Sequence, residues 1–552
     1  MCGGGIDCVD FFDGPPDSSL LDAHEIDDYL QHSFLPWARR NDELIIAVAD
    51  TSNTNLSWLA ARYGGHLRLV PVEWTTITAA IENVFREQLT HDAVYGLADA
   101  EPHLCARETI TRKQIVIFSA LAATIIVVAI AWPAIASAGL AIVLTIGYLA
   151  NIMFRTSLVW VGAKETAEHT PSPAAHIPDL SLPRYTVMVP LYREANILPS
   201  LIGALRALDY PPEQLDIKIV VEADDAETFA AACALDLLAP FEIIRVPDHQ
   251  PRTKPAACNY ALRLARGEFT VIFDAEDRPE PDQLRKAVAA FRACPPEVGC
   301  LQARLNFYNA NENWLTRLFT LDYSLWFDFL LPGLDRLHVP MPLGGTSNHF
   351  RTSVLRAIHG WDAFNVTEDA DLGIRLARLG YRAMTLDSTT FEEATNRVGN
   401  WVKQRSRWLK GYMQTWLVHM RDPVALFRHA GFRGAMAFQL FIGGAITSAL
   451  INPLLWCVFI ASHVWGAALL GPAFNATLAH ASLVSLITGN TLFTYLAMLG
   501  PYRRGWLELT PYGLTAPFYW LLISIAAYRA LWQLITRPFH WEKTQHGTSA
   551  MA

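Results

Sequence analysis

Residues 367–408 of the chain read TEDADLGIRLARLGYRAMTLDSTTFEEATNRVGNWVKQRSRW. The stretch opens with a Thr-Glu-Asp triplet, ending at Asp369, and closes with a Gln-x-x-Arg-Trp cluster, which begins at Gln404. These two residues are 35 positions apart. Taken alone, the two motifs also fit an exposed acid followed by a basic, aromatic helix on a membrane surface. The rest of the chain is needed to choose between a catalytic pair and this simpler interpretation.

In this order and spacing, the motifs resemble the TED and Q(R/Q)xRW motifs of processive, membrane-embedded family-2 glycosyltransferases, the group of cellulose, chitin, hyaluronan and poly-N-acetylglucosamine synthases. The resemblance covers about residues 112–547. It implies an α/β fold in which a GT-A-type nucleotide-sugar-binding domain is inserted between transmembrane helices. It also implies that Asp369 is the general base, which takes a proton from the acceptor hydroxyl. The implied acceptor site consists of Thr367, Glu368, Gln404, Arg407 and Trp408.

Acidic residues follow the ends of several predicted strands upstream of these motifs. Strands are predicted at 185–190, 217–222, 242–246 and 269–273, and they alternate with helical segments. An open α/β sheet binds its ligand at the carboxyl ends of its strands, so these side chains are expected to meet there. The resemblance assigns Tyr192, Glu194 and Asp224 to the uridine of the donor, and Lys254 and Asp274 to its diphosphate side.

The run Asp274-Ala275-Glu276-Asp277 resembles the DxD metal motif of the same family. A departing diphosphate needs its charge neutralised, and oxygen ligands suit Mg²⁺ or Mn²⁺. Asp274 is therefore expected to be one metal ligand. Either Glu276 or Asp277 is expected to be the second, and the sequence leaves both open.

The composition indicates a membrane protein with a soluble part. Of its 552 residues, 52% are hydrophobic and 18% charged, and the mean hydropathy is +0.19. A net charge of −9 argues against a nucleic-acid partner, which needs basic surface. The eight cysteines include no Cys-x-x-Cys pair, so neither a zinc site nor a disulfide framework is expected.

Apolar runs place the predicted membrane segments on both sides of a catalytic domain at 183–425. Residues 112–160 are predicted to form a transmembrane hairpin with both ends in the cytoplasm, since basic residues flank its outer ends. Residues 434–536 are predicted to contain interfacial and transmembrane helices, divided at Asn452-Pro453. The segment 517–535 is long enough to span the membrane, but an interfacial or re-entrant helix is favoured, and the number of spans after residue 434 stays open. The tail, 537–552, resembles the family's gating loop, with Phe539, Trp541, Lys543 and Thr544 as its residues.

Residues 1–105 are predicted to form a small α/β domain with strands at 43–49 and 66–72 and helices at 23–31 and 75–88. It resembles the N-terminal domain of type II secretion ATPases, which also occurs fused to some family-2 glycosyltransferases. Some relatives bind cyclic di-GMP through a patterned Arg-Leu-Gly segment. This chain lacks that segment, so a regulatory or contact module that is dispensable for the chemistry is favoured over cyclic di-GMP binding. No cleavable signal peptide is predicted, which places this domain in the cytoplasm.

The resemblance therefore implies an inverting, processive glycosyltransferase that polymerises a β-linked extracellular polysaccharide from a UDP-sugar and helps to export it. The expected partners are the donor, the growing polysaccharide, the lipid bilayer and envelope export proteins. The expected location is a bacterial-type inner membrane, crossed several times, with the catalytic domain in the cytoplasm. Two alternatives are single-sugar transfer to a polyprenyl phosphate and a non-catalytic receptor or assembly subunit.

Overall fold

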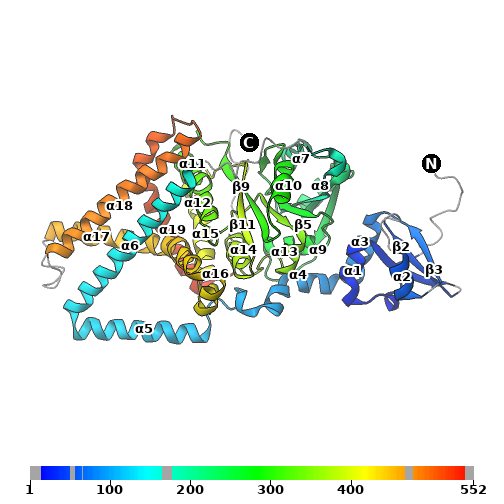
Figure 1. Ribbon diagram of the computed structural model, residues 1–552, viewed down its shortest axis with the longest axis horizontal. Coiled ribbons are helices and arrows are strands. Elements are labelled where there is room, and N and C mark those ends of the chain that lie inside the picture. The colour runs from blue at the N-terminus through cyan, green and yellow to red at the C-terminus, as the bar shows by residue number, and fades with distance from the viewer. Residues whose placement is uncertain are drawn as a thin grey trace.

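The computed structural model describes residues 14–40, 42–49, 56–64, 66–164, 177–465, 476–540 and 542. Figure 1 shows three parts along the long axis: a small N-terminal domain, a central domain around a large sheet, and a group of long helices. The central sheet has eight strands and the N-terminal sheet has three, which confirms the predicted mixed α/β class.

The N-terminal sheet has the order β1-β2-β3, with β1 antiparallel and β3 parallel to β2. Strand β1 was not predicted, because Pro36 interrupts its alternating pattern, and the pairing register shifts just after this residue. The predicted helix at 75–88 is two helices, which meet at Phe85. The elements are α1 (Ile26–Gln31), β1 (Phe34–Arg40), β2 (Glu43–Val48), α2 (Leu56–Tyr63), β3 (Leu67–Pro71), α3 (Trp74–Val84) and α4 (Arg86–Ala100).

Helix α4 and the segment after it pack on the central domain, although the predicted boundary at residue 105 assigned them to the N-terminal domain. Asn259 donates a hydrogen bond to the carbonyl of Ala93 in α4 at 2.9 Å. The backbone N–H of Ala106 donates to the buried carboxylate of Asp362 at 2.6 Å. Removing residues 1–105 would therefore uncover part of the central core.

The central sheet has the order β6-β5-β4-β7-β10-β9-β11-β8. Strands β6, β5, β4 and β7 are mutually parallel, β10 runs antiparallel to both of its neighbours, and β11 is parallel to β9. Strands β4 and β5 are apolar along most of their length, as expected where helices cover both faces. The strands are β4 (Tyr185–Leu191), β5 (Leu215–Glu222), β6 (Phe241–Val246), β7 (Phe269–Ile272), β8 (Arg278–Pro279), β9 (Val298–Phe307), β10 (Asn348–Arg351) and β11 (Arg382–Glu392).

Helices surround this sheet and lead from it to the long helices. Those beside the sheet are α7 (Leu198–Arg206), α8 (Ala226–Ala234), α9 (Lys254–Arg263), α10 (Gln283–Ala293), α13 (Thr352–Ala357) and α14 (Glu368–Arg378). Those toward the long helices are α11 (Trp314–Leu325), α12 (Leu331–Arg336) and α15 (Val398–His419). The long helices are α5 (Arg112–Ala131), α6 (Pro133–Ala163), α16 (Pro423–Phe438), α17 (Gly444–Trp465), α18 (Ala476–Arg503) and α19 (Ala516–Thr536).

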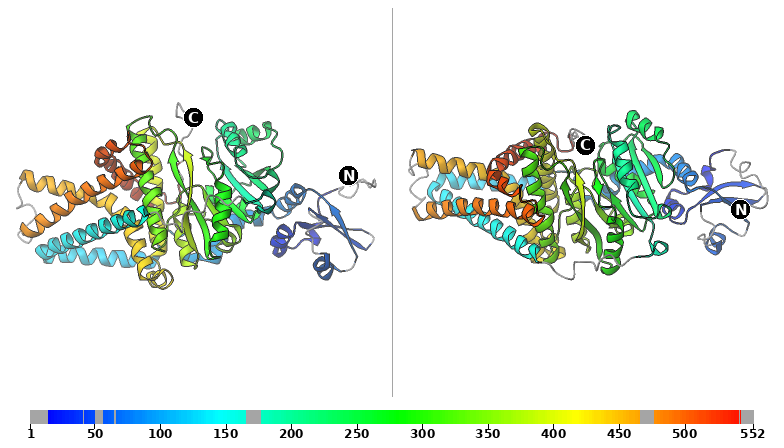
Figure 2. Two further views of the ribbon diagram at one scale, coloured as in Figure 1. Left: turned by 45° about the horizontal axis from the view of Figure 1, so that its top comes forward. Right: turned by 90° about the horizontal axis from the view of Figure 1, so that it is seen from above.

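Within the described residues, five helices are long and apolar enough to cross a membrane: 112–131, 133–163, 423–458, 481–503 and 510–536. Figures 1 and 2 show α5, α6, α17 and α18 projecting away from the sheet, whereas α19 stays beside it along α15. The chain thus has a membrane-type helical part joined to a sheet domain.

The predicted division of the second helical block at Asn452-Pro453 is wrong, because α17 continues through Pro453. A neighbouring helix can satisfy the backbone groups that a proline frees inside a membrane helix. Tyr528 of α19 donates to the carbonyl of Leu450 at 2.6 Å, beside that position. The chain bends instead at Gly431, whose φ of +68° lies in the left-handed region that glycine adopts readily.

Candidate active site

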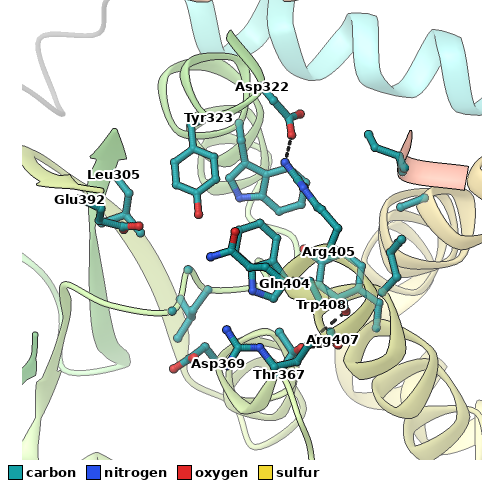
Figure 3. A pocket seen from close by; sticks show the side chains of 18 of the residues that line it. Leu305, Asp322, Tyr323, Thr367, Asp369, Glu392, Gln404, Arg405, Arg407 and Trp408 are labelled. Carbon is teal, nitrogen blue, oxygen red and sulfur yellow. Dashed lines mark hydrogen bonds and ion pairs between the residues drawn. The ribbon is translucent and has the colours of Figure 1, made fainter. Parts of the chain in front are cut away.

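One cavity of about 600 Å³ begins at the carboxyl ends of β4 and β5 and continues between the long helices. Figure 3 shows part of its wall, with the two motifs of residues 367–408 on the same side. Its lining comes from the loops after β4 and β7, the last residue of β5, the helices α9, α14 and α15, and the long helices α6, α17, α18 and α19. Predicted binding residues and membrane helices therefore share one space.

The loop after β4 forms one end of this cavity. Tyr192 donates from its hydroxyl to Asp224 at 3.2 Å, and Arg252 donates to the same carboxylate at 2.6 Å. Tyr192, Glu194 and Arg252 line the cavity, whereas Asp224 supports two of them. Glu222 also lines this end, and burial raises its pKa to about 8. The sequence did not indicate Arg252 or Glu222, since no motif marked either residue.

Lys254, the first residue of α9, joins two parts of the site. Its amine lies 2.6 Å from Asp274 and donates to the carbonyl of Gly345 at 2.9 Å. Burial disfavours its charge, but Asp274 and Asp369 outweigh burial and hold the pKa of Lys254 well above its ordinary value. A fixed cation therefore lies between the predicted diphosphate acids and the predicted base.

The run 274–277 turns its acids in different directions. Asp274 and Glu276 line the cavity. Asp277 is buried and accepts hydrogen bonds from the backbone N–H of Asp274, at 2.7 Å, and from the hydroxyl of Thr346. Burial and the charges of Asp274 and Glu276 raise the pKa of Asp277. The structure thus places Glu276, and not Asp277, in the cavity beside Asp274.

A divalent cation fits this donor set. Among the described residues, no three His, Cys, Asp or Glu side chains form a group that could hold a metal on their own. Mg²⁺, however, is usually held by one or two carboxylates and completed by substrate phosphates. Asp274 and Glu276, beside Lys254, supply that pair of oxygen ligands on the donor side of the cavity.

The Thr-Glu-Asp triplet forms the N-terminal end of α14. A Cβ atom placed on Gly345 would lie 3.8 Å from Oδ2 of Asp369, so this carboxylate faces the same loop that receives Lys254. Burial, followed by the charge of Glu368, raises the pKa of Asp369 well above its ordinary range, against the opposing effect of Lys254. Such a carboxylate can exchange a proton nearer to neutral pH than an exposed aspartate.

Helix α15 carries the Gln-x-x-Arg-Trp cluster to the same place. The hydroxyl of Thr367 donates to the carbonyl of Arg407 at 3.3 Å. A Cβ atom on Gly411 would lie 2.1 Å from that hydroxyl, so α14 and α15 touch at this point. Gln404 lines the cavity and accepts a hydrogen bond from Thr395 at 3.1 Å. The structure therefore brings together the two motifs that the sequence separates by 35 positions.

Trp408 belongs to an aromatic wall. Its ring centre lies 6.1 Å from that of Tyr323 and 5.9 Å from that of Phe319. The guanidinium of Arg405 lies 4.8 Å from the Trp408 ring and forms an ion pair with Asp322 of α11. These contacts hold the indole in place, and its face is a surface on which a sugar ring can stack.

Burial lowers the pKa of Arg407, and the negative charges of Glu368 and Asp274 partly offset this decrease. The predicted acceptor residues Thr367, Glu368, Gln404, Arg407 and Trp408 all line the cavity. The predicted base thus shares a wall with the predicted acceptor residues.

Glu392, the last residue of β11, faces the cavity beside Leu305 and opposite this wall (Figure 3). Its oxygen Oε1 is buried and has no hydrogen-bond partner within the described part of the chain. No motif predicted this residue.

The described part of the tail reaches the central domain. The ring centres of Phe539 and Phe364 are 5.7 Å apart, and Lys410 of α15 donates to the carbonyl of His540 at 2.7 Å. The tail therefore reaches the helix that carries Gln404, Arg407 and Trp408. The other predicted tail residues, Trp541, Lys543 and Thr544, lie outside the described residues.

Carboxylates near strand ends share one cavity with Asp369 and Trp408, an arrangement that suits transfer of a sugar from a nucleotide donor. Residues 269–533 match the family model described as glycosyl transferase family group 2, and residues 4–91 match the MshEN domain. The chain therefore carries a family 2 glycosyltransferase domain and an N-terminal MshEN domain. This confirms the predicted enzyme class and the predicted likeness of the first domain to that of type II secretion ATPases.

Among curated proteins, the chain is similar to two proteins of Arabidopsis thaliana, probable glucomannan 4-beta-mannosyltransferases 1 and 10. It is 29% identical to the first over 240 residues and 28% to the second over 237 residues, in each case 42% of this chain and 43% of the relative. Among solved structures, it is similar to the mannosyltransferase PcManGT of Pyrobaculum calidifontis, in complex with GDP-Man and Mn²⁺. That match has 21% identity and a TM-score of 0.45 and covers 72% of this chain and 99% of the other.

Proposed function

We propose that the protein is an inverting, processive glycosyltransferase that polymerises a hexose from a nucleotide-sugar donor into a β-linked polysaccharide and passes the product into the membrane. The single cavity that runs from the catalytic carboxylates to α6, α17, α18 and α19 carries this proposal. A transferase that releases each product to solvent has no need for an acceptor space between membrane helices.

The lining of the deep end supports a carbohydrate occupant. Asn452 and Asn490 place amide groups there, and Trp520 and Phe493 place aromatic rings. The Oδ1 atom of Asn452 is buried without a hydrogen-bond partner in the described residues. Amides can bind sugar hydroxyls, and aromatic rings can pack on the C–H faces of a pyranose.

The proposed chemistry assigns one role to each part of the catalytic end. Tyr192, with Asp224 behind it, binds the nucleoside, and Lys254 binds the diphosphate. A divalent cation held by Asp274 and Glu276 would neutralise the departing diphosphate. Asp369 accepts the proton of the acceptor hydroxyl as that oxygen attacks the anomeric carbon from the opposite face, which inverts the configuration.

The N-terminal domain and the C-terminal tail both contact the catalytic domain, so we infer that the helices cross the membrane an even number of times. The MshEN domain packs on the catalytic domain through α4, and the tail packs on it through Phe539. We therefore propose that α5, α6, α17 and α18 cross the bilayer and that α19 lies at the interface, with the catalytic domain in the cytoplasm of a bacterial-type cell. An envelope export partner would meet the far ends of the crossing helices.

A lipid-phosphate acceptor is the second candidate function. Arg155, near the end of α6, lines the cavity, donates to Asn151 at 3.1 Å and faces the ring of Phe441. No carboxylate lies within ion-pair distance of Arg155 in the described ranges. An arginine at a membrane interface is a suitable phosphate ligand, so single-sugar transfer to a polyprenyl phosphate would use this residue.

The decisive experiment incubates the full-length protein, purified in nanodiscs, with Mg²⁺ or Mn²⁺ and a panel of donors. The curated relatives are named mannosyltransferases, so GDP-mannose joins UDP-glucose and UDP-N-acetylglucosamine. A polymer cleaved only by β-specific glycosidases supports the proposal. A chloroform-extractable glycolipid with one added sugar supports the second candidate, and the absence of any transfer contradicts both.

Processivity is tested by Trp408→Ala. Loss of the stacking platform is expected to weaken retention of the growing chain more than formation of the glycosidic bond. We expect shorter polymer and more nucleotide released per sugar incorporated, measured by gel filtration and a coupled nucleotide assay. Unchanged polymer length and an unchanged release ratio would make Trp408 a packing residue only.

A further inference from the structure

The carboxyl group of Glu392 is the feature of the catalytic cavity that the proposed chemistry leaves unused. Its backbone is fixed, because the carbonyl accepts a hydrogen bond from the N–H of Tyr308 at 3.1 Å and β11 pairs Glu392 with Phe307 of β9. The side chain then extends into the cavity beside Leu305 (Figure 3). The strand therefore holds this acid at a defined place on the wall.

One oxygen of this carboxyl group has no partner in the described structure. The Oε1 atom of Glu392 is buried and accepts no hydrogen bond from any described residue. Leaving a buried acceptor unsatisfied is costly, so such an atom is retained where a ligand completes its bonding. The neighbouring Glu393, just past the end of β11, is buried but does not line the cavity.

The position of Glu392 identifies the kind of ligand. Asp274 and Glu276, the proposed metal ligands, line the same end of the cavity as Asp369 and Trp408. A transferred hexose must lie between these two pairs of residues, because its anomeric carbon joins the diphosphate to the acceptor oxygen. Glu392 lies across the cavity from Gln404 and Trp408 (Figure 3), so a hexose bound at this end can present its hydroxyl groups to it.

We propose that Glu392 selects the donor sugar by accepting hydrogen bonds from ring hydroxyl groups of the hexose that is transferred. This inference rests on the proposed function and names the residue that sets its sugar specificity. A site built to bind a hydroxyl rejects an analogue that lacks it, because the buried acceptor is then left unpaired. Epimers that move this hydroxyl away from the carboxylate are rejected for the same reason.

The test uses the full-length protein in nanodiscs and the best donor from the panel, together with its monodeoxy analogues at C2, C3, C4 and C6 of the hexose. The measured quantity is kcat/KM for nucleotide release that depends on acceptor, for the wild type, Glu392→Gln and Glu392→Ala. The control is Asp387→Asn, since Asp387 is an exposed acid of the same strand that pairs with Arg304 outside the cavity.

We expect one deoxy analogue to be poorer than the parent donor by roughly 10²–10⁴-fold with the wild type and with the Asp387→Asn control. With Glu392→Ala, the parent donor should lose a similar factor, and the penalty for that analogue should fall to less than tenfold. This non-additivity shows that hydroxyl and carboxylate act on each other, which general damage to the fold would not produce. The penalty for this analogue with Glu392→Gln should lie between the wild-type and Glu392→Ala values, since an amide keeps one acceptor oxygen.

Two results overturn the inference. If Glu392→Ala keeps the wild-type ranking of all four analogues, the residue does not read the donor sugar, whereas the proposed function stands. If the wild type turns over no nucleotide sugar of the panel, the proposed function fails and the inference fails with it. Size-exclusion chromatography of each variant in detergent shows whether it is folded, and the ranking within one variant does not depend on its active fraction.

Discussion

The charge of single residues decides what the catalytic end can do. Asp369 is buried beside a second carboxylate, Glu368, and its pKa is raised, while the positive charge of Lys254 opposes this shift. A base with a raised pKa holds a proton more strongly after the transfer than an exposed aspartate would. Under the proposed function, the site would therefore favour removal of a proton from a hydroxyl group, which is a poor acid.

Asp369→Asn should abolish transfer and leave donor binding nearly intact. The amide keeps the shape of the side chain but cannot accept the proton, and this step contributes about 10²–10⁴-fold. Transfer is measured by polymer formation, and donor binding by calorimetry with the free nucleotide diphosphate. Turnover within a factor of three of the wild type would remove Asp369 from the role of base.

The metal role separates Glu276 from Asp277. Glu276→Gln should raise the concentration of Mg²⁺ or Mn²⁺ needed for half-maximal activity by about tenfold or more, because one of two carboxylate ligands is lost. Asp277→Asn should mainly lower the melting temperature, since this carboxylate accepts bonds from Asp274 and Thr346. Full activity of the wild type in excess EDTA would contradict a metal role altogether.

At the scale of elements, the two motifs function together because α14 and α15 touch at Gly411. A side chain there would meet both the hydroxyl and the backbone N–H of Thr367, at 2.1 and 2.7 Å. Thr367 begins the helix that carries Asp369, so any shift moves the base relative to Trp408. A displacement of about 1 Å in a catalytic group can cost roughly 10²-fold in rate.

Gly411→Ala should therefore reduce transfer strongly and lower stability by about 1–3 kcal/mol, the usual cost of overpacking. The matched control is Gly399→Ala in the same helix, where an added Cβ meets nothing within 4 Å. The control should be neutral or slightly stabilising, because alanine favours helix more than glycine does. Equal activity of the two variants would show that the contact of α14 with α15 does not position the base.

The elements show which features the sequence could predict. The strands that end near Tyr192, Asp224 and Asp274 were predictable, since short apolar runs followed by polar residues are a local signal. The bend at Gly431 was not, because the residues around Pro453 look like a helix end although neighbouring helices allow α17 to continue.

Side-chain roles were harder to predict than strands. The Asp274 run predicted a metal motif, but only its three-dimensional turn shows that Glu276 faces the cavity. Arg252, Glu222 and Glu392 carry no local motif. They join the site through long-range strand and helix packing, which one sequence does not reveal.

At the scale of the whole molecule, a polar contact links the MshEN domain to the central sheet. Thr78 of α3 donates to Glu242 of β6 at 3.3 Å, and Glu242 pairs with Lys218, which is fully buried in β5. Burial raises the pKa of Glu82, also in α3, to about 7, and Tyr260, Glu242 and Lys218 face it. Strand β5 ends at Glu222, which lines the end of the cavity proposed to bind the nucleotide. The contacts of the first domain with β6 and β5 are therefore only a few residues away from the proposed donor site.

This contact should make stability depend on pH. The folded protein keeps a proton on Glu82 up to about pH 7, whereas the unfolded chain loses it near the ordinary pKa of 4.5. Stability from this group is present at acidic pH and falls as the pH rises toward 7, by roughly 1–3 kcal/mol. The measurement is the melting temperature of the wild type and Glu82→Gln at pH 5.5 and pH 8.

The wild type should lose more of its melting temperature between these pH values than Glu82→Gln, which cannot titrate at this site. Glu87→Gln, an exposed position at the start of α4, is the control and should follow the wild type. If Glu82→Gln and the wild type show the same pH dependence, the titration of Glu82 does not bear on the stability of the folded chain.

Under the proposed function, the cavity has one reactive end, so elongation of the polysaccharide is coupled to its movement through the cavity. Each transfer adds a ring beside Asp369, and the chain must advance by one ring toward α17 and α18 before the next donor can react. Under the proposed function, cleavage of the glycosyl–phosphate bond of each donor supplies the work for this movement. The enzyme then behaves as a motor under load. A product tethered on the far side of a bilayer should stall donor turnover, and release of the tether should restart it.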